Sequence, residues 1–320
     1  MMIENALENP IFLVASVRSG TTLLAVMLDH HPEIAFPGEF EFSVDLLEAG
    51  GELPNMESFH AWLRVNRHFL WHGLEIDPSL DYPELVRSFL FQMKQAGNGG
   101  AKQHVGVSVH RSFEHLPDLW PEGRYIHLLR DPRDVGASIM VEGWAGNHFT
   151  GARQWRETEE SWERLKARIP PERWIEIRFE NLASDTHSTL SRVCDFIGVP
   201  YRGEMMTYPE NSTYSAVNPG IRERWRRKQT PREVQLSEAG AGEMLEQRGY
   251  EWSGEPRLSV GLTRTRLIEL HCRLVRLRWR LKRYGFRLWI ERRLAQALAI
   301  QAWQDSVELR EHEITNRYLK

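Results

Sequence analysis

The hydrophobic residues of this chain fall into short continuous runs that are separated by longer amphipathic stretches. Short apolar runs are typical of strands that are covered on both faces. They occur at 11–16, 34–36, 105–109, 124–129 and 174–179. Apolar residues at helical spacing follow, at 22–30, 131–142, 152–168 and 184–197. Strands that alternate with helices predict an α/β fold, in which a mostly parallel sheet is flanked by helices.

The rest of the pattern adds helices and one domain boundary. Further helices are predicted at 40–48, 58–71, 83–95 and 232–247, with a loop at 211–228. The turn residues Gly254 and Pro256 mark the expected end of the main domain. We therefore predict a catalytic domain over 1–255 and a basic amphipathic helical extension over 256–320.

Composition and charge narrow the classes of protein that need considering. The chain has 320 residues, of which 41% are hydrophobic and 27% charged, so it can build a packed core. No apolar run approaches the ~20 residues that cross a bilayer, and the first residues do not resemble a signal peptide. Cys194 and Cys272 lie in separate helical segments, which argues against a disulfide framework. These features favour a cytoplasmic protein.

Charge is distributed unevenly along the chain. The net charge is −3, yet residues 262–290 carry nine Lys or Arg against one acid, Glu269. This segment sums to +8, so the remainder sums to −11. The asymmetry indicates a separate role for the C-terminal extension.

A polar turn joins the first predicted strand to its helix and contains Arg18, Ser19, Gly20, Thr21 and Thr22. A strand, a short polar turn and a helix can direct backbone N–H groups at a bound phosphate. The turn is not a Walker A motif, because alignment on Gly20 and Thr22 puts Thr21 at the lysine position. Arg18 supplies the cation instead. A polar turn with a capping side chain is the alternative interpretation.

A second candidate motif follows the strand at 124–129. Arg130 and Ser138 are eight residues apart, so an arginine at a strand end and a serine two turns into the next helix can reach one phosphate. Arg130 taken alone could equally be an ion-pair partner.

Together the two motifs resemble those of sulfotransferases that use 3'-phosphoadenosine 5'-phosphosulfate (PAPS), with the tyrosylprotein and carbohydrate enzymes as the most similar branch. The resemblance spans roughly residues 10–252 and implies a P-loop-like sheet. It also implies that Arg18, Ser19, Gly20, Thr21 and Thr22 hold the 5'-phosphosulfate and that Arg130 and Ser138 hold the 3'-phosphate. Trp225-Arg226-Arg227-Lys228 is similar to a late Trp-x-x-Lys segment of tyrosylprotein sulfotransferases, which gives Lys228 a part in binding the cofactor. The released product would be 3'-phosphoadenosine 5'-phosphate.

Sulfuryl transfer needs fixed positive charge and a base. Arg18 is the candidate catalytic cation. Glu39 matches the spacing and Gly-Glu context of the catalytic glutamate in the tyrosylprotein enzymes, and its apolar neighbours predict a raised pKa. The alternative interpretation of Glu39 is an acid that favours the dipole of a following helix. His110 is the rival base, because its segment resembles the one that holds the catalytic histidine of cytosolic sulfotransferases. This scheme requires no metal.

The acceptor stays open between a peptide tyrosine, a carbohydrate, a lipid and a small phenol or alcohol. Two other functions are also open: a P-loop-like ATP phosphotransferase, and a non-catalytic nucleotide-binding module with an interaction tail. In the extension an apolar stripe follows a heptad, over Leu267, Leu270, Leu274, Leu277, Leu281, Tyr284 and Leu288. It predicts packing on the catalytic domain, a homodimer seam, or peripheral contact with an anionic inner-membrane surface. Nucleic acid is disfavoured because the main domain is acidic.

Overall fold

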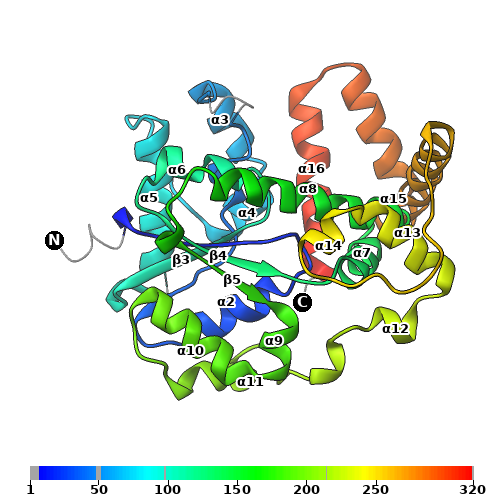
Figure 1. The fold of residues 1–320 in the computed structure, drawn as a ribbon. Coiled ribbons are helices and arrows are strands. Elements are labelled where there is room, and N and C mark those ends of the chain that lie inside the picture. Colours follow the sequence, from blue (N-terminus) through cyan, green and yellow to red (C-terminus); the bar gives the residue numbers. More distant parts are fainter. Residues whose placement is uncertain (1–6, 48–51, 97–98, 214, 319–320) are drawn as a thin grey trace.

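The computed structural model describes residues 7–47, 52–96, 99–213 and 215–318, and within them five strands form one parallel sheet (Figure 1). The strands are β1 (Ile11–Val14), β2 (Ile34–Ala35), β3 (His104–Val109), β4 (Arg124–Leu129) and β5 (Trp174–Arg178). Their order is β2-β3-β1-β4-β5. The predicted α/β fold with a parallel, helix-flanked sheet is confirmed.

Strand β1 lies at the centre of the sheet, with Phe12 level with Val107 of β3 on one side and Tyr125 of β4 on the other. All four of its residues are buried. The chain leaves β1 toward the β3 side and later returns to the β4 side, so the strand order reverses here. Open parallel sheets bind ligands at the carboxyl ends of the strands beside such a reversal.

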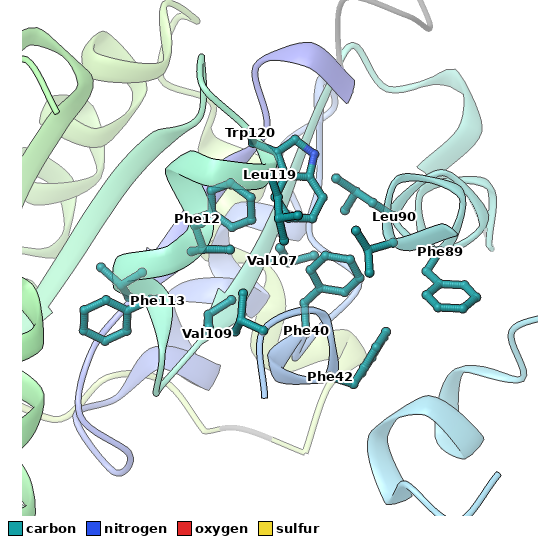
Figure 2. Packing of buried hydrophobic residues seen from close by; sticks show 14 of the residues in the cluster. Phe12, Phe40, Phe42, Phe89, Leu90, Val107, Val109, Phe113, Leu119 and Trp120 are labelled. Atoms are coloured by element: carbon teal, nitrogen blue, oxygen red, sulfur yellow. The ribbon is translucent and has the colours of Figure 1, made fainter. Parts of the chain in front are cut away.

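Helices cover both faces of this sheet. Helices α2 (Thr21–Asp29), α9 (Phe179–Ser184) and α10 (Thr186–Ile197) pack on the face that carries Leu13 and Ile126. The opposite face carries Phe12 and meets the helices α3 (Met56–Leu63), α4 (Arg67–His72), α5 (Tyr82–Gln95) and α6 (Leu116–Leu119). Figure 2 shows the aromatic centre of this second cluster, where Trp120 lies near both Phe12 and Phe40.

Helices α7 (Pro132–Val141) and α8 (His148–Lys166) approach each other without intervening side chains. A Cβ on Gly136 would lie 2.9 Å from the backbone nitrogen of Ala152, and one on Gly151 would lie 2.6 Å from the carbonyl oxygen of Gly136. Helix α13 (Pro231–Ala241) packs against both of them. This tight contact fixes the position of α7, which carries Ser138.

A buried ionic cluster joins the sheet to α8. His127 of β4 lies 3.3 Å from Glu159 and 3.1 Å from Glu176, and Arg248 pairs with Glu159 at 2.8 Å. Burial alone would lower the pKa of His127, but the two carboxylates outweigh burial and raise it. Burial would likewise raise the pKa of Glu176, yet His127 and Arg248 lower it to about 2. The cluster therefore favours a protonated His127 beside an ionised Glu176.

Three predicted helices in the main domain differ from the structure. In the predicted helix 40–48, only Glu41–Ser43 forms a single 3-10 turn, because residues 40–44 are buried on all sides, and residue 48 lies outside the described residues. The predicted helix 58–71 is two helices, since the Asn66 side chain caps α4 by accepting from the Phe69 N–H at 3.0 Å. Gly242, with φ +61°, divides the predicted helix 232–247 into α13 and α14 (Met244–Gln247).

The predicted loop 211–228 also differs, because it contains a short helix, α12 (Trp225–Lys228), and follows another, α11 (Tyr208–Asn211). The helix α12 brings its basic side chains next to the carboxyl edge of the sheet, as described below.

The C-terminal extension consists of α15 (Leu262–Ala297) and α16 (Gln301–Tyr318), which fold into the hairpin at the upper right of Figure 1. Gly285 interrupts α15 with φ +81° and ψ 159°, so the predicted heptad does not run through one continuous helix. The first half of α15 packs on the main domain: the Gly146 N–H donates to Cys272 Sγ at 3.2 Å, and Trp279 Nε1 donates to the Val141 carbonyl at 3.2 Å. Of the described helices, none is long and apolar enough to cross a membrane.

Candidate active site

One cavity of about 650 Å³ lies at the carboxyl ends of the central strands. It brings together most of the side chains that the sequence singled out. Its lining includes Arg18, Gly20, Thr21, Thr22, Glu39, His110, Arg130, Ser138 and Lys228. Ser19 is the exception: it is buried beside the cavity, and its backbone N–H donates to the Ser16 carbonyl at 3.2 Å. The two motifs therefore open onto a shared space.

The turn after β1 has an unusual backbone. Arg18 has φ +69° and Gly20 has φ +100°, both in the left-handed region that non-glycine residues rarely adopt. A Cβ on Gly20 would also lie 2.4 Å from the Phe179 ring, so only glycine fits there. Helix α2 begins at the next residue, and the first N–H groups of a helix have no intrahelical acceptor. The turn thus presents the amino end of α2 to the cavity.

The two motifs are in direct contact. Arg18 Nε donates to Ser138 Oγ at 3.0 Å, and Arg130 donates to the Arg18 carbonyl at 3.2 Å. The guanidinium of Arg130 lies 4.2 Å from the centroid of the Phe179 ring, the same ring that touches Gly20. Arg18 also pairs with Glu142 at 3.2 Å. The Phe179 ring therefore packs against both Arg130 and the turn that carries Arg18.

Lys228 reaches the cavity because α12 is anchored to α7. The Asp134 carboxylate accepts hydrogen bonds from the backbone N–H groups of Arg224, at 3.1 Å, and Trp225, at 2.8 Å. The guanidinium of Arg133 stacks 3.7 Å from a ring centroid of Trp225. Lys228 itself is exposed at the cavity wall.

A cluster of acidic and imidazole side chains reaches the cavity through Glu39 and His110. The His68 ring of α4 lies 2.9 Å from Glu39 Oε2 and 3.4 Å from Glu41 Oε2. Glu41 also bonds to His110 Nδ1, and His110 Nε2 lies 2.9 Å from the Thr21 hydroxyl. These five residues form one chain of contacts from Glu39 to the turn after β1.

The predicted raised pKa of Glu39 is wrong. Burial does raise it, but the hydrogen bond and the charge of His68 outweigh burial, so the pKa of Glu39 lies below its ordinary value. Burial disfavours the charged form of His68, but Glu39 and Glu41 favour it more strongly. The pKa of His68 therefore rises to about 9. The carboxylate of Glu41 likewise outweighs burial and raises the pKa of His110. At neutral pH these contacts favour ionised glutamates and the protonated forms of His68 and His110.

The two candidate bases, Glu39 and His110, differ in how far their side chains are exposed to the cavity. The Glu39 side chain is 42% exposed and lines the cavity. Both ring nitrogens of His110 are engaged, one by Glu41 and one by Thr21, and the side chain is only 6% exposed. An ionised carboxylate that is open to the cavity can accept a proton from a bound hydroxyl, whereas His110 must first release a partner.

In the part of the chain that the structure describes, one group of side chains has the spacing of metal ligands. One ligand atom each of Glu39, Glu41 and His68 lies within 4.8 Å of the others. These side chains could hold a cation, but their ion pairs already account for their arrangement.

Sequence reasoning missed the roles of His68, Glu41 and Asp134. Glu41 fell within a predicted helix that does not form, so its direction could not be inferred. His68 did leave a signal, because His72 follows it by four residues on the same helix face. His72 Nε2 lies 3.3 Å from the Glu39 carbonyl, so both histidines of this pair meet Glu39.

Known proteins resemble this chain in sequence or in fold. A curated relative, protein-tyrosine sulfotransferase A of Caenorhabditis elegans, is 21% identical over 209 residues, which are 62% of this chain and 52% of the relative. The chain thus spans about half the length of that relative. Among solved structures, the sulfotransferase domain from the curacin biosynthetic pathway is 17% identical with a TM-score of 0.52, covering 76% of this chain and 98% of that one.

A second solved structure, the sulfotransferase domain of the Synechococcus PCC 7002 olefin synthase, is 21% identical with a TM-score of 0.49, covering 73% of this chain and 96% of that one. The model of the sulfotransferase family matches residues 10–203, which is more than half of the chain and includes both motifs of the cavity. The chain therefore belongs to the sulfotransferase family.

Proposed function

We propose that this protein transfers a sulfuryl group from PAPS to an acceptor hydroxyl. The observation that carries the proposal is the shared cavity: the turn after β1 and the Arg130–Ser138 pair, which the family uses for opposite ends of one nucleotide, line the same space. Family membership supports the reaction type. The acceptor class stays open between peptide tyrosine, carbohydrate, lipid and small phenol or alcohol.

The lining fits a ligand with several negative charges. Arg18, Arg130, Arg224 and Lys228 all border the cavity, and the amino end of α2 adds its partial positive charge. We assign Arg18 and residues 19–22 to the 5'-phosphosulfate, with Ser19 holding the shape of the turn through the hydrogen bond from its N–H to the Ser16 carbonyl. Arg130, Ser138 and Lys228 are assigned to the 3'-phosphate. PAPS supplies an activated sulfuryl group, and 3'-phosphoadenosine 5'-phosphate is what remains after transfer.

We assign the base to Glu39. Its ionised carboxylate takes the proton of the acceptor hydroxyl while the hydroxyl oxygen bonds to sulfur and the bond from sulfur to the 5'-phosphate oxygen breaks. Arg18 and the amino end of α2 stabilise the negative charge that develops on that oxygen. An arginine suits this task because a guanidinium presents a planar fork of hydrogen-bond donors to an anion.

The histidines position other groups. His68 holds the Glu39 carboxylate, and the protonated His110 donates to the Thr21 hydroxyl, which leaves the hydroxyl proton of Thr21 free to point at a bound anion. We therefore treat His110 as a positioning residue, with a direct role as base as the alternative.

Turnover and binding assays test these assignments. We expect Arg18→Ala and Glu39→Gln to abolish sulfuryl transfer from PAPS, and Glu39→Gln to keep its affinity for 3'-phosphoadenosine 5'-phosphate. Glu57→Gln, an exposed glutamate of α3, is the matched control and should behave as wild type. Near-normal turnover in Glu39→Gln together with loss in His110→Ala would assign the base to His110.

Calorimetry separates the proposal from an ATP-dependent phosphotransferase. The turn after β1 has Thr21 where a Walker A motif has lysine, so we expect binding of 3'-phosphoadenosine 5'-phosphate and no comparable binding of ATP. Tighter binding of ATP with Mg²⁺ would overturn the assignment of the nucleotide. Binding of the nucleotide without transfer to any hydroxyl in a cell extract would instead favour a non-catalytic module.

A further inference from the structure

The first half of α15 has two different faces. Cys272 and Trp279 hold one face against the end of α7 and the segment that joins α7 to α8. At about 3.6 residues per turn, Leu267, Leu270 and Leu274 fall on the opposite side of the helix from Cys272. They are 62%, 53% and 51% exposed. An apolar stripe therefore points away from the main domain.

Positive charge surrounds this stripe. Arg264, Arg266, Arg273, Arg278, Arg280 and Lys282 are all exposed. The one acid between residues 262 and 290, Glu269, is paired with Arg153 at 2.9 Å. The exposed side of the helix thus combines leucines with cations that no acid on the same segment neutralises.

We propose that this face of α15 docks on an anionic lipid bilayer. A basic helix with exposed leucines lies in a membrane interface with its apolar side chains inserted and its cations near the headgroups. The remainder of the chain, at −11, is repelled by the same surface, so the charge asymmetry orients the protein with α15 toward the lipid.

Two other occupants fit this face less well. A second copy of the chain would bring two +8 segments together, and like charges across a seam oppose association. A nucleic acid would satisfy the arginines but would leave the leucines exposed to water, since its backbone offers phosphates rather than an apolar surface. Lipid matches the leucines and the cations together.

The contacts of α15 link the docked face to the cavity. Trp279 bonds to the Val141 carbonyl, and its ring lies where a Cβ on Gly143 would be, 2.2 Å from the nearest ring atom. Val141, the last residue of α7, and Trp144 line the cavity and are 74% and 45% exposed. A bilayer bound at α15 therefore lies one helix away from the cavity wall.

Co-sedimentation of the full chain with vesicles tests the proposal. The vesicles are phosphatidylcholine alone or phosphatidylcholine with phosphatidylserine, each at low and high salt. We expect at least about tenfold stronger binding to the anionic vesicles, weakened by salt. The variants Leu267→Gln/Leu270→Gln/Leu274→Gln and Arg273→Gln/Arg278→Gln/Arg280→Gln should each lose about tenfold or more.

A matched control carries Leu53→Gln and Arg192→Gln, which change an equally exposed leucine and an exposed arginine outside the extension. It should bind as wild type, and circular dichroism with unfolding midpoints shows whether each variant keeps its fold.

Equal binding to both kinds of vesicle, or unchanged binding by both triple variants, overturns the proposal. A leucine variant that dissociates a dimer in analytical ultracentrifugation, with unchanged vesicle binding, assigns the face to a second copy. Because these measurements need no turnover, they are independent of the proposed reaction.

Discussion

Gly20→Ala tests whether the Phe179 ring supports both anion-binding ends of the cavity. Gly20 has φ +100°, and a Cβ there would lie 2.4 Å from Cε2 and 2.5 Å from Cδ2 of Phe179. The guanidinium of Arg130 lies 4.2 Å from the centroid of the same ring. The added methyl group must therefore displace the ring, and Arg130 has to follow or lose its stacking partner.

The expected loss of unfolding free energy has two parts, which a matched glycine substitution can separate. Gly198 has φ +89°, but a Cβ there would meet no heavy atom within 4 Å. Gly198→Ala thus measures backbone strain alone, about 1–2 kcal/mol of unfolding free energy. Gly20→Ala adds the overpacking of an aromatic ring, about 1–3 kcal/mol. We expect losses of about 2–5 kcal/mol for Gly20→Ala and about 1–2 kcal/mol for Gly198→Ala.

Denaturant unfolding measures the stabilities, and calorimetric titration with 3'-phosphoadenosine 5'-phosphate measures the site. A charged hydrogen bond contributes about 1.5–3 kcal/mol, so a misplaced Arg130 should weaken nucleotide binding by about tenfold or more. Gly198→Ala should bind as wild type. If the two variants show the same loss of stability and the same affinity, the Phe179 ring moves freely and does not connect the two ends.

Three other changes follow from the described contacts. In His68→Gln, the charge and hydrogen bond of His68 no longer oppose burial, so the pKa of Glu39 rises and the acid limb of the kcat/KM profile moves to higher pH; an unmoved limb means that Glu39 is not the base. Gly151→Ala places a Cβ 2.6 Å from the Gly136 carbonyl oxygen and should lower the unfolding free energy by about 1–3 kcal/mol, measured in denaturant. The raised pKa of His127 means that its stabilisation is complete below about pH 6.5 and is lost as the pH rises through the folded-state pKa. The stability difference between wild type and His127→Gln should therefore narrow at alkaline pH, and a difference that grows there contradicts this protonation state.

The sheet could be predicted from sequence because its strands are short and buried on both faces. All five apolar runs became strands within two residues of the predicted ends. The helix predicted at 40–48 did not form, because every side chain from residue 40 to residue 44 is buried and no polar face remains to set a helical period. Continuous burial removes the amphipathic signal on which such a prediction depends.

Part of the candidate site could also be predicted from sequence, and part could not. Arg18, Arg130 and Ser138 could be brought together from sequence, because each follows a strand whose carboxyl end meets the same edge of the sheet. The protonation state of Glu39 could not be predicted from sequence, because it depends on His68. Tertiary packing of α4 places His68 beside Glu39. The apolar neighbours of Glu39 predicted its burial. The charge of His68, which opposes the effect of burial on the pKa, could not be inferred from residues near Glu39 in sequence.

The anchor of α12 has a consequence for how this chain can change. Asp134 lies within the range that the family model matches, while the segment it holds lies beyond residue 203. Because Asp134 accepts from backbone N–H groups, any residues except proline at positions 224 and 225 can supply the same donors. The wall that carries Lys228 can therefore diverge in sequence, or be exchanged between relatives, while it keeps its place beside the nucleotide cavity.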